Sequence, residues 1–321
     1  MTDLPKGIHI VEEGPREGFQ FEKGQIPTSR KIELIDALSA TGLKHIQIVS
    51  FVDPRRVPGM ADAEDVVRGI TPVKGVTYTG LWLNDKGFER ALATQRLDVR
   101  GTITVGASDA FLKRNQNRTI QEQIASQYPM TRRYKELGVP VTRGGMMAAF
   151  GCNYEGDIPV DRVVSLVGEL LAIANDTGVT LDYVSLADTM AWATPLSVKR
   201  VIGAIRDKYP DVEISLHLHD TRGMGLANAY AGLEMGITRF DSAVAGLGGC
   251  PFAGHAGAAG NIATEDLVFM CEEMGIATGV DLDALIQCAL LAEDIVGHPL
   301  PGSVMKGGTL ARLRAARQAN Q

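Results

Sequence analysis

Short runs of β-branched or apolar residues recur along this sequence, and segments with helical periodicity separate them. Residues 8–14 predict a strand, residues 28–42 an amphipathic helix and residues 44–50 a second strand. The same alternation predicts further strands at 76–82, 99–106, 141–150, 181–188, 213–220 and 240–249. Eight strands that each precede helical sequence are typical of a closed parallel barrel, because right-handed βαβ connections assemble it readily. We therefore predict an α/β fold, a (β/α)8 TIM barrel with a C-terminal helical extension.

A doubly wound open sheet shares this alternation and is the main competing fold. A dinucleotide-binding sheet of that kind carries G-x-G-x-x-G after its first strand, whereas EGPREGFQ follows here. The length of 321 residues suits one barrel with insertions. We expect residues 1–321 to form a single catalytic domain, with the barrel at about 7–275 and a helical segment at about 276–321.

Charge and composition exclude several classes of function. The formal net charge is −6 without long runs of one sign, whereas a nucleic-acid-binding surface needs a concentrated basic patch. No apolar stretch reaches the roughly 18 residues of a membrane span, so we expect neither nucleic acid nor membrane as a partner. The four cysteines have no C-x-x-C spacing and no signal peptide is recognisable, which favours reduced thiols and a cytoplasmic location.

His217 and His219 stand two residues apart in SLHLHD, at the end of the seventh predicted strand. Side chains two apart on a strand point to one side, so both imidazoles can converge on one cation at the barrel mouth. Two half-buried strand histidines held by hydrogen bonds are the plainer alternative. Both interpretations remain open at this point.

Two further segments carry polar residues at predicted strand ends. EEGPREGFQ at 12–20 places Arg16 beside Glu17, where an arginine can neutralise an enolate and a carboxylate can bind a metal. A surface turn with a solvated ion pair would look the same. The glycine-rich run 245–266 contains Cys250 and Asn261 and can close over a site, although such loops are often plain connections.

Several segments together resemble one known family. They are GPREGFQ, SFVDPRRVPGMAD at 50–62, NDKGFERAL at 84–92, LADT at 186–189, HLHDTRGMGLAN at 217–228, AGLGGCP and GNIATEDLV. In order and spacing they are similar to the signature segments of 3-hydroxy-3-methylglutaryl-CoA lyase (HMG-CoA lyase), within the DRE-TIM metallolyase superfamily that includes isopropylmalate synthase. The resemblance covers about residues 7–300, and its Gly-Gly-Cys-Pro loop is typical of the lyases rather than the synthases.

The resemblance implies a divalent-metal site and a carbon–carbon bond cleavage. His217, His219 and Asn261 would ligate the cation, and Glu17 would supply a carboxylate ligand. Mg²⁺ or Mn²⁺ fits this mixed set of nitrogen and oxygen ligands, and Zn²⁺ or Co²⁺ also remains open. The expected substrate is an acyl-CoA that is cleaved to acetyl-CoA and a keto acid.

Three further roles follow from the same resemblance. Arg16 would stabilise the enolate of the departing acyl-CoA, and Cys250 would protonate its carbon. Asp188 matches a family aspartate near the arginine and would orient it or move a proton. The base that takes the hydroxyl proton stays open between Asp188 and solvent on the metal.

The sequence departs from the family pattern beside the metal. Glu17 stands where the family usually has aspartate, and Gln47 stands where it usually has glutamate, so that Arg16 is expected to lose an anionic partner. Gln47, Met147, Asn84 and Lys86 are expected to line the substrate pocket. Because Met147 makes that pocket more apolar, a related 3-hydroxy-3-substituted acyl-CoA becomes a second candidate substrate.

Two other functions compete with the lyase. One is a Claisen-condensing acyl-CoA synthase of the same superfamily, which would usually add a C-terminal regulatory domain. The other is a non-catalytic metal-binding or CoA-binding barrel, because a preserved fold does not guarantee a preserved activity. Barrels of this kind often self-associate, so a homodimer or higher homo-oligomer is expected.

Overall fold

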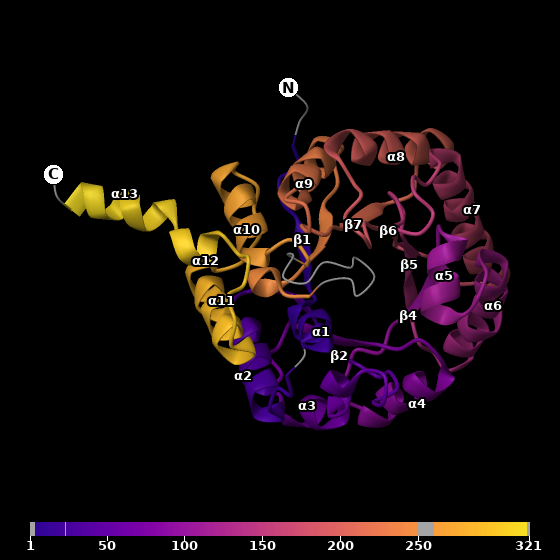
Figure 1. The fold of residues 1–321 in the computed structure, drawn as a ribbon, viewed down its shortest axis with the longest axis horizontal. Coiled ribbons are helices and arrows are strands. Elements are labelled where there is room, and N and C mark those ends of the chain that lie inside the picture. The colour runs from indigo at the N-terminus through magenta and orange to yellow at the C-terminus, as the bar shows by residue number, and fades with distance from the viewer. Residues whose placement is uncertain (1–3, 23, 249–259, 320–321) are drawn as a thin grey trace. The chain divides into compact units, whose positions relative to one another are not determined.

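The computed structural model describes residues 4–22, 24–248 and 260–319. Eight strands, β1 to β8, alternate with helices along the chain (Figure 1). The chain divides into two compact units. Of the described residues, the first unit takes 4–5 and 98–241, and the second takes 6–22, 24–97, 242–248 and 260–319. None of the described helices has the length and apolar character that crossing a membrane requires.

The second unit contains three parallel strands and the C-terminal helices. Its elements are β1 (His9–Glu12), β2 (His45–Ser50), β3 (Thr77–Leu81), α2 (Thr28–Ser39), α3 (Ala63–Gly69), α4 (Asp85–Thr94), α10 (Thr264–Glu273), α11 (Leu282–Val296), α12 (Val304–Gly307) and α13 (Leu310–Ala319). Leu34, Ile35 and Leu38 recur at helical spacing on α2 and are fully buried, so this face of the helix packs into the core. Gly42 has a φ of +94°, and a Cβ there would lie 2.4 Å from the carbonyl oxygen of Gly279. Only glycine fits where α2 turns back toward the sheet.

The first unit contains five parallel strands with helices along their outer side (Figure 1). Its elements are β4 (Gly101–Gly106), β5 (Val141–Met147), β6 (Tyr183–Ala187), β7 (Ile214–His217), β8 (Arg239–Ser242), α5 (Asp109–Gln116), α6 (Ile120–Glu136), α7 (Val160–Thr177), α8 (Pro195–Lys208) and α9 (Gly225–Glu234). Ser242, which ends β8, belongs to the second unit. Thr119 and Glu122 form a capping box that starts α6. Ile214 and Leu216 on β7 are almost completely buried, as is typical of a parallel strand.

The eight predicted strands are confirmed, but several end earlier than expected. The predicted strand 213–220 ends at His217, so the prediction that His219 lies on the strand is wrong. The predicted strand 141–150 ends at Met147, because Ala148 turns the chain with a φ of 54°. The predicted strand 8–14 ends at Glu12, because a helical turn starts at Gly14. The expectation of one catalytic domain over residues 1–321 stays a prediction.

A buried carboxyl group fixes the turn that follows β8. Glu265, in the first turn of α10, accepts a hydrogen bond from the backbone N–H of Ala245 at 2.9 Å. Ala245 adopts a φ of 58°, which is strained for a residue with a side chain. Burial raises the pKa of Glu265 from 4.5 to about 8. Glu265 is therefore protonated in the folded protein at neutral pH.

Replacing Glu265 by glutamine is expected to flatten the pH dependence of the free energy of unfolding. Between pH 4.5 and about 8 the folded protein holds a proton on Glu265 that the unfolded chain releases. The stability of the wild type therefore falls as the pH rises through this window, by up to about 1.4 kcal/mol per pH unit from this group. Urea unfolding of both proteins at about pH 5.5 and about pH 7.5 measures the two slopes. Equal slopes would contradict the prediction.

Candidate active site

A buried π-helical turn, Gly14–Gly18, follows β1 and carries Arg16 and Glu17. The backbone carbonyl of Glu13 accepts hydrogen bonds from the N–H groups of Arg16 at 3.1 Å and Glu17 at 2.7 Å. Single π-helical turns are frequent at functional sites. Arg16 is 9% exposed and Glu17 is 6% exposed, so the alternative of a solvated surface turn is excluded.

Glu12 joins the start of this turn to the segment after β8 and to α10. Its carboxylate accepts hydrogen bonds from the N–H of Gly14 at 2.7 Å, the N–H of Val244 at 2.8 Å and the hydroxyl of Thr264 at 2.5 Å. Burial raises the pKa of Glu12 to about 7, although these hydrogen bonds favour its ionised form. Glu12 fixes the backbone from which Arg16 and Glu17 project.

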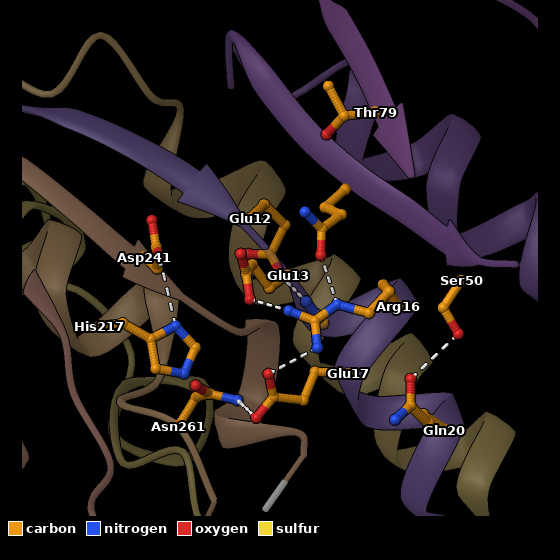
Figure 2. A network of polar contacts seen from close by, with 12 residues as sticks. Glu12, Glu13, Arg16, Glu17, Gln20, Ser50, Thr79, His217, Asp241 and Asn261 are labelled. Carbon is orange, nitrogen blue, oxygen red and sulfur yellow. Dashed lines mark hydrogen bonds and ion pairs between the residues drawn. The ribbon is translucent and has the colours of Figure 1, made fainter. Parts of the chain in front are cut away.

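Three side chains surround the guanidinium group of Arg16 (Figure 2). Its Nη2 donates to Glu13 Oε2, and its Nη1 lies 2.9 Å from Glu17 Oε2. Its Nε donates to Oε1 of Gln47 on β2. Gln47 therefore remains a hydrogen-bond partner of Arg16, although it carries no charge. A buried arginine is tolerated here because carboxylates on both sides compensate its charge.

Asn261 completes this group from the segment before α10. Its Nδ2 donates to Glu17 Oε1 at 3.0 Å (Figure 2). The same Nδ2 donates to the carbonyl of Leu247 at 3.2 Å. Its Oδ1 is buried and has no hydrogen-bond partner among the described residues. A buried amide oxygen without a hydrogen bond costs free energy of folding unless another group binds it. Amide oxygens are also among the ligands that hard cations accept. The orphaned oxygen fits the metal-ligand role expected for Asn261.

Replacing Gly248 by alanine is expected to displace Asn261 and Glu17. Gly248 has a φ of +95°, and a Cβ there would lie 2.7 Å from Asn261 Nδ2 and 3.0 Å from Glu17 Cγ. We expect the variant to lose about 2–3 kcal/mol of stability and most of its affinity for Mn²⁺. Gly279→Ala is the matched control, because Gly279 also has a positive φ but nothing lies within 4 Å of its Cβ position. Thermal unfolding and Mn²⁺ titration of both variants measure the difference, and identical behaviour would contradict the prediction.

In the first unit, His217 pairs in register with Asp241 on the neighbouring strand β8. Asp241 Oδ2 lies 3.3 Å from His217 Nδ1 (Figure 2) and accepts from Arg143 Nη2 at 2.6 Å. Burial opposes ionisation of Asp241, but the charge of Arg143 and the contact with His217 lower its pKa below the usual value. A carboxylate at Nδ1 holds the imidazole proton there and leaves Nε2 as an acceptor. This is the tautomer that a metal ligand needs.

His219 follows β7 and turns back toward His217. The two Nε2 atoms lie 3.2 Å apart, and the residues His217 and His219 are 9% and 3% exposed. Two ligand atoms about 2.1 Å from one cation and at a right angle to each other lie about 3 Å apart. Both histidines are among the groups that could hold a metal ion. The same separation also suits one hydrogen bond between the two imidazoles, so it is compatible with both interpretations and the shared cation stays a prediction.

Asp188 is a buried carboxyl group just after β6. Its Oδ1 accepts hydrogen bonds from the N–H groups of Trp192 at 2.7 Å and Ala193 at 3.0 Å. Its Oδ2 is buried without a hydrogen-bond partner in the described part of the chain. Burial raises the pKa of Asp188 to about 6, against the opposing effect of charge on His219. A carboxyl group that can exchange its proton near neutral pH suits acid–base chemistry.

The residues expected to line the substrate pocket have less distinctive surroundings. Asn84 caps the N-terminus of α4 by accepting from the N–H of Gly87 at 3.0 Å, and Lys86 is exposed on the first turn of that helix. Met147 is the half-buried last residue of β5. The role of these three residues in substrate binding stays a prediction.

Sequence reasoning missed Glu13, Asp241 and Arg143. Glu13 directly precedes the GPREG motif and follows another glutamate, Glu12, at the end of an apolar run, which was a usable signal. Asp241 and Arg143 gave no signal, because their partners are distant in the sequence. Cys250 lies outside the described residues. The three described cysteines are all buried and free.

Comparison with known proteins places this arrangement in a family. The sequence profile of the HMGL-like family matches residues 7–291. Hydroxymethylglutaryl-CoA lyase of Bacillus subtilis (strain 168) is 40% identical over 297 residues, which cover 92% of this chain and 96% of that protein. The mitochondrial hydroxymethylglutaryl-CoA lyase of Gallus gallus is 41% identical over 283 residues, covering 88% of this chain and 91% of that protein.

Solved structures agree with the sequence comparison. Hydroxymethylglutaryl-CoA lyase from Pseudomonas aeruginosa has a TM-score of 0.87 and 39% identity, covering 96% of this chain and 99% of that chain. An HMG-CoA lyase from Acinetobacter baumannii, solved with coenzyme A and 3-methylmalate, has a TM-score of 0.85 and 38% identity, covering 96% and 97%. The protein is therefore a (β/α)8-barrel lyase. More particularly, the chain belongs to the HMG-CoA lyase family of the DRE-TIM superfamily.

Proposed function

We propose that this protein cleaves 3-hydroxy-3-methylglutaryl-CoA, or a closely related 3-hydroxy-3-substituted acyl-CoA, to acetyl-CoA and a keto acid. The observation that carries this proposal is the buried Arg16, held by three side chains on a π-helical turn. A buried, preorganised cation is what a developing thioester enolate requires. The lyase relatives favour cleavage over the condensing synthase considered above.

The proposed reaction uses a divalent cation, with Mg²⁺ or Mn²⁺ preferred and Zn²⁺ or Co²⁺ as alternatives. His217, His219, Asn261 and Glu17 would hold it. The orphaned Oδ1 of Asn261 and the convergent Nε2 atoms of the histidines support this assignment. When bound, the cation would acidify the substrate hydroxyl group and orient it with the neighbouring carbonyl oxygen.

The remaining steps fall to the side chains. Asp188, through its unpartnered Oδ2, takes the proton of the tertiary hydroxyl group, so that the oxygen's electrons form the ketone as the Cα–Cβ bond breaks. The bond's electron pair moves onto the thioester, where Arg16 stabilises the enolate oxygen. Cys250 then donates a proton to the enolate carbon and releases acetyl-CoA.

The residues that depart from the family pattern would affect which acyl group the pocket accepts. Glu17, Gln47 and Met147 leave the chemistry intact but alter the volume and charge available around the substituent at C3. Asn84 and Lys86 lie on α4 and its cap, where they would meet the polar part of the acyl-CoA. Homologues with larger or more apolar C3 substituents are therefore the next candidates if HMG-CoA is a poor substrate.

The first test is an assay of the purified protein on HMG-CoA with Mg²⁺ or Mn²⁺, measuring acetyl-CoA and acetoacetate. We expect cleavage that EDTA abolishes, that added Mn²⁺ restores, and that Cys250→Ala lowers by about 10²-fold or more. If the protein is inert toward HMG-CoA but cleaves a C3-substituted homologue, that homologue is the better assignment of the substrate. Inertness toward the whole panel would contradict the proposal.

Two properties belong to the same proposal. We place the lyase in the cytoplasm, supported by the free thiols of Cys152, Cys271 and Cys288. We also expect a homodimer or higher homo-oligomer, which light scattering at assay concentration measures directly.

A further inference from the structure

The guanidinium group of Arg16 has an anionic partner that does not come from β2. The side chain that contacts its Nε from β2 is the neutral amide of Gln47. Gln47 still accepts a hydrogen bond from Arg16 Nε, but an amide brings no negative charge. Arg16 is only 9% exposed, so its charge needs compensation by nearby anions, and Glu17 beside Nη1 is one of them.

Glu13, directly after β1, supplies a second anion beside Nη2. Its side chain is 2% exposed, and Oε2 forms an ion pair with Arg16 Nη2. The backbone of Glu13 is fixed as well, because its N–H donates to the carbonyl of Ser242 at 2.8 Å and its carbonyl accepts from Arg16 and Glu17. Glu13 is therefore held at both ends, by backbone and by side chain.

We propose that Glu13 is the positioning residue for Arg16 in this protein and supplies a charge that the neutral Gln47 does not. This inference rests on the proposed function of Arg16. The carboxylate of Glu13 stands directly after β1, and the amide of Gln47 on the neighbouring strand β2 accepts the hydrogen bond from Nε.

The arrangement fixes the direction of the guanidinium plane. Glu13 engages Nη2, Glu17 engages Nη1 and Gln47 engages Nε, so each of the three nitrogens has one acceptor. An arginine has five N–H donors, which leaves donors for a substrate oxygen. Removing the charge of Glu13 leaves the Nη2 side of the guanidinium plane less firmly held. We therefore expect a slower enolate-forming step rather than weaker substrate binding.

A double-mutant cycle, with the wild type and three variants, tests whether the charge of Glu13 positions Arg16. Glu13→Gln keeps size and hydrogen bonding but removes the anion, and we expect kcat to fall by about 10–100-fold with KM within about 3-fold. Gln47→Glu alone adds a third carboxylate and should lower kcat by less. The double variant Glu13→Gln/Gln47→Glu moves the charge to β2, and we expect it to recover kcat to within about 5-fold of the wild type.

The matched control is Glu33→Gln. Glu33 also pairs with an arginine three residues away, Arg30, but on the exposed surface of α2. We expect wild-type kinetics and thermal unfolding from it. A loss of kcat in Glu13→Gln that the double variant fails to recover, with its melting temperature unchanged, would overturn the proposal. Unchanged kcat in Glu13→Gln would overturn it as well.

A second readout separates this inference from the proposed function. The ¹⁵N–H signal of Arg16 Nε, assigned from its disappearance in Arg16→Lys, reports whether the guanidinium group is fixed. We expect slow exchange with water in the wild type and the double variant, and exchange at least about 10-fold faster in Glu13→Gln. If no acyl-CoA is cleaved, the proposed function fails, whereas the exchange pattern still decides the role of Glu13. Equal exchange rates in all variants would overturn the positioning role.

Discussion

Replacing Arg16 by lysine is expected to lower kcat for acyl-CoA cleavage by about 10³-fold, with little change in KM. The positive charge is retained, so the loss measures geometry. A lysine ammonium group is a single point and cannot contact Glu13, Glu17 and Gln47 in the directions that the guanidinium group does. The ammonium group of the lysine would then have to reorient during the reaction in order to stabilise the enolate.

Arg30→Lys is the control for this substitution. Arg30 also binds two carboxylates, Glu33 and Asp294, but its side chain is 32% exposed. We expect that variant to keep wild-type kcat. Steady-state kinetics and thermal unfolding of both variants make the comparison. A fall in kcat of less than about 10-fold in Arg16→Lys would mean that charge alone suffices and would remove the geometric argument.

Replacing Asp188 by asparagine is expected to lower kcat by about 10²–10⁴-fold while leaving the fold intact. Asparagine keeps the Oδ1 that accepts from the N–H groups of Trp192 and Ala193. It loses the basic Oδ2, the atom proposed to take the hydroxyl proton. Burial raises the pKa of Asp188 to about 6, so the wild-type group is ionised at pH 8 at some cost in stability. We therefore expect the variant to unfold at the same or a higher temperature than the wild type at that pH.

Asp266→Asn is the matched control for Asp188→Asn. Asp266 is also a buried aspartate, and it accepts hydrogen bonds from the backbone N–H groups of Ser303 and Val304. It has no proposed part in the chemistry, so kcat should stay within about 3-fold of the wild type. Comparable kcat losses in both variants would point to a general effect on folding. A wild-type kcat in Asp188→Asn would show that another group takes the proton.

The sequence was sufficient for the fold because its signals are local. Each strand is a short β-branched run and each helix has apolar residues at its own spacing, so neighbours in the chain specify each element. The strand ends were less predictable. His219 was expected on a strand, yet β7 ends at His217, because the end depends on which backbone groups find partners in adjacent strands.

The candidate site was predictable where its residues share a motif. Arg16 and Glu17 are adjacent in the chain, and His217 and His219 are separated by one residue, so a pattern could reveal them. The loss of an anion beside Arg16 was inferred from Gln47 alone, and the structure adds that Glu13 forms an ion pair with Arg16. The identity of that partner depends on side-chain direction at the end of β1, which no spacing rule gives.

By itself, the sequence determined the alternation of strands and helices, the family and the chemical types at the site. The tertiary structure alone decided which charges are buried and how they are compensated. It brought Arg143 on β5 into contact with Asp241 on β8, 98 residues away in the chain, and Asp241 in turn contacts His217. It also left the Oδ1 of Asn261 and the Oδ2 of Asp188 without partners among the described residues. The reason is physical: pKa values and ligand geometry depend on burial and on contacts across neighbouring strands, which exist only once the chain has folded.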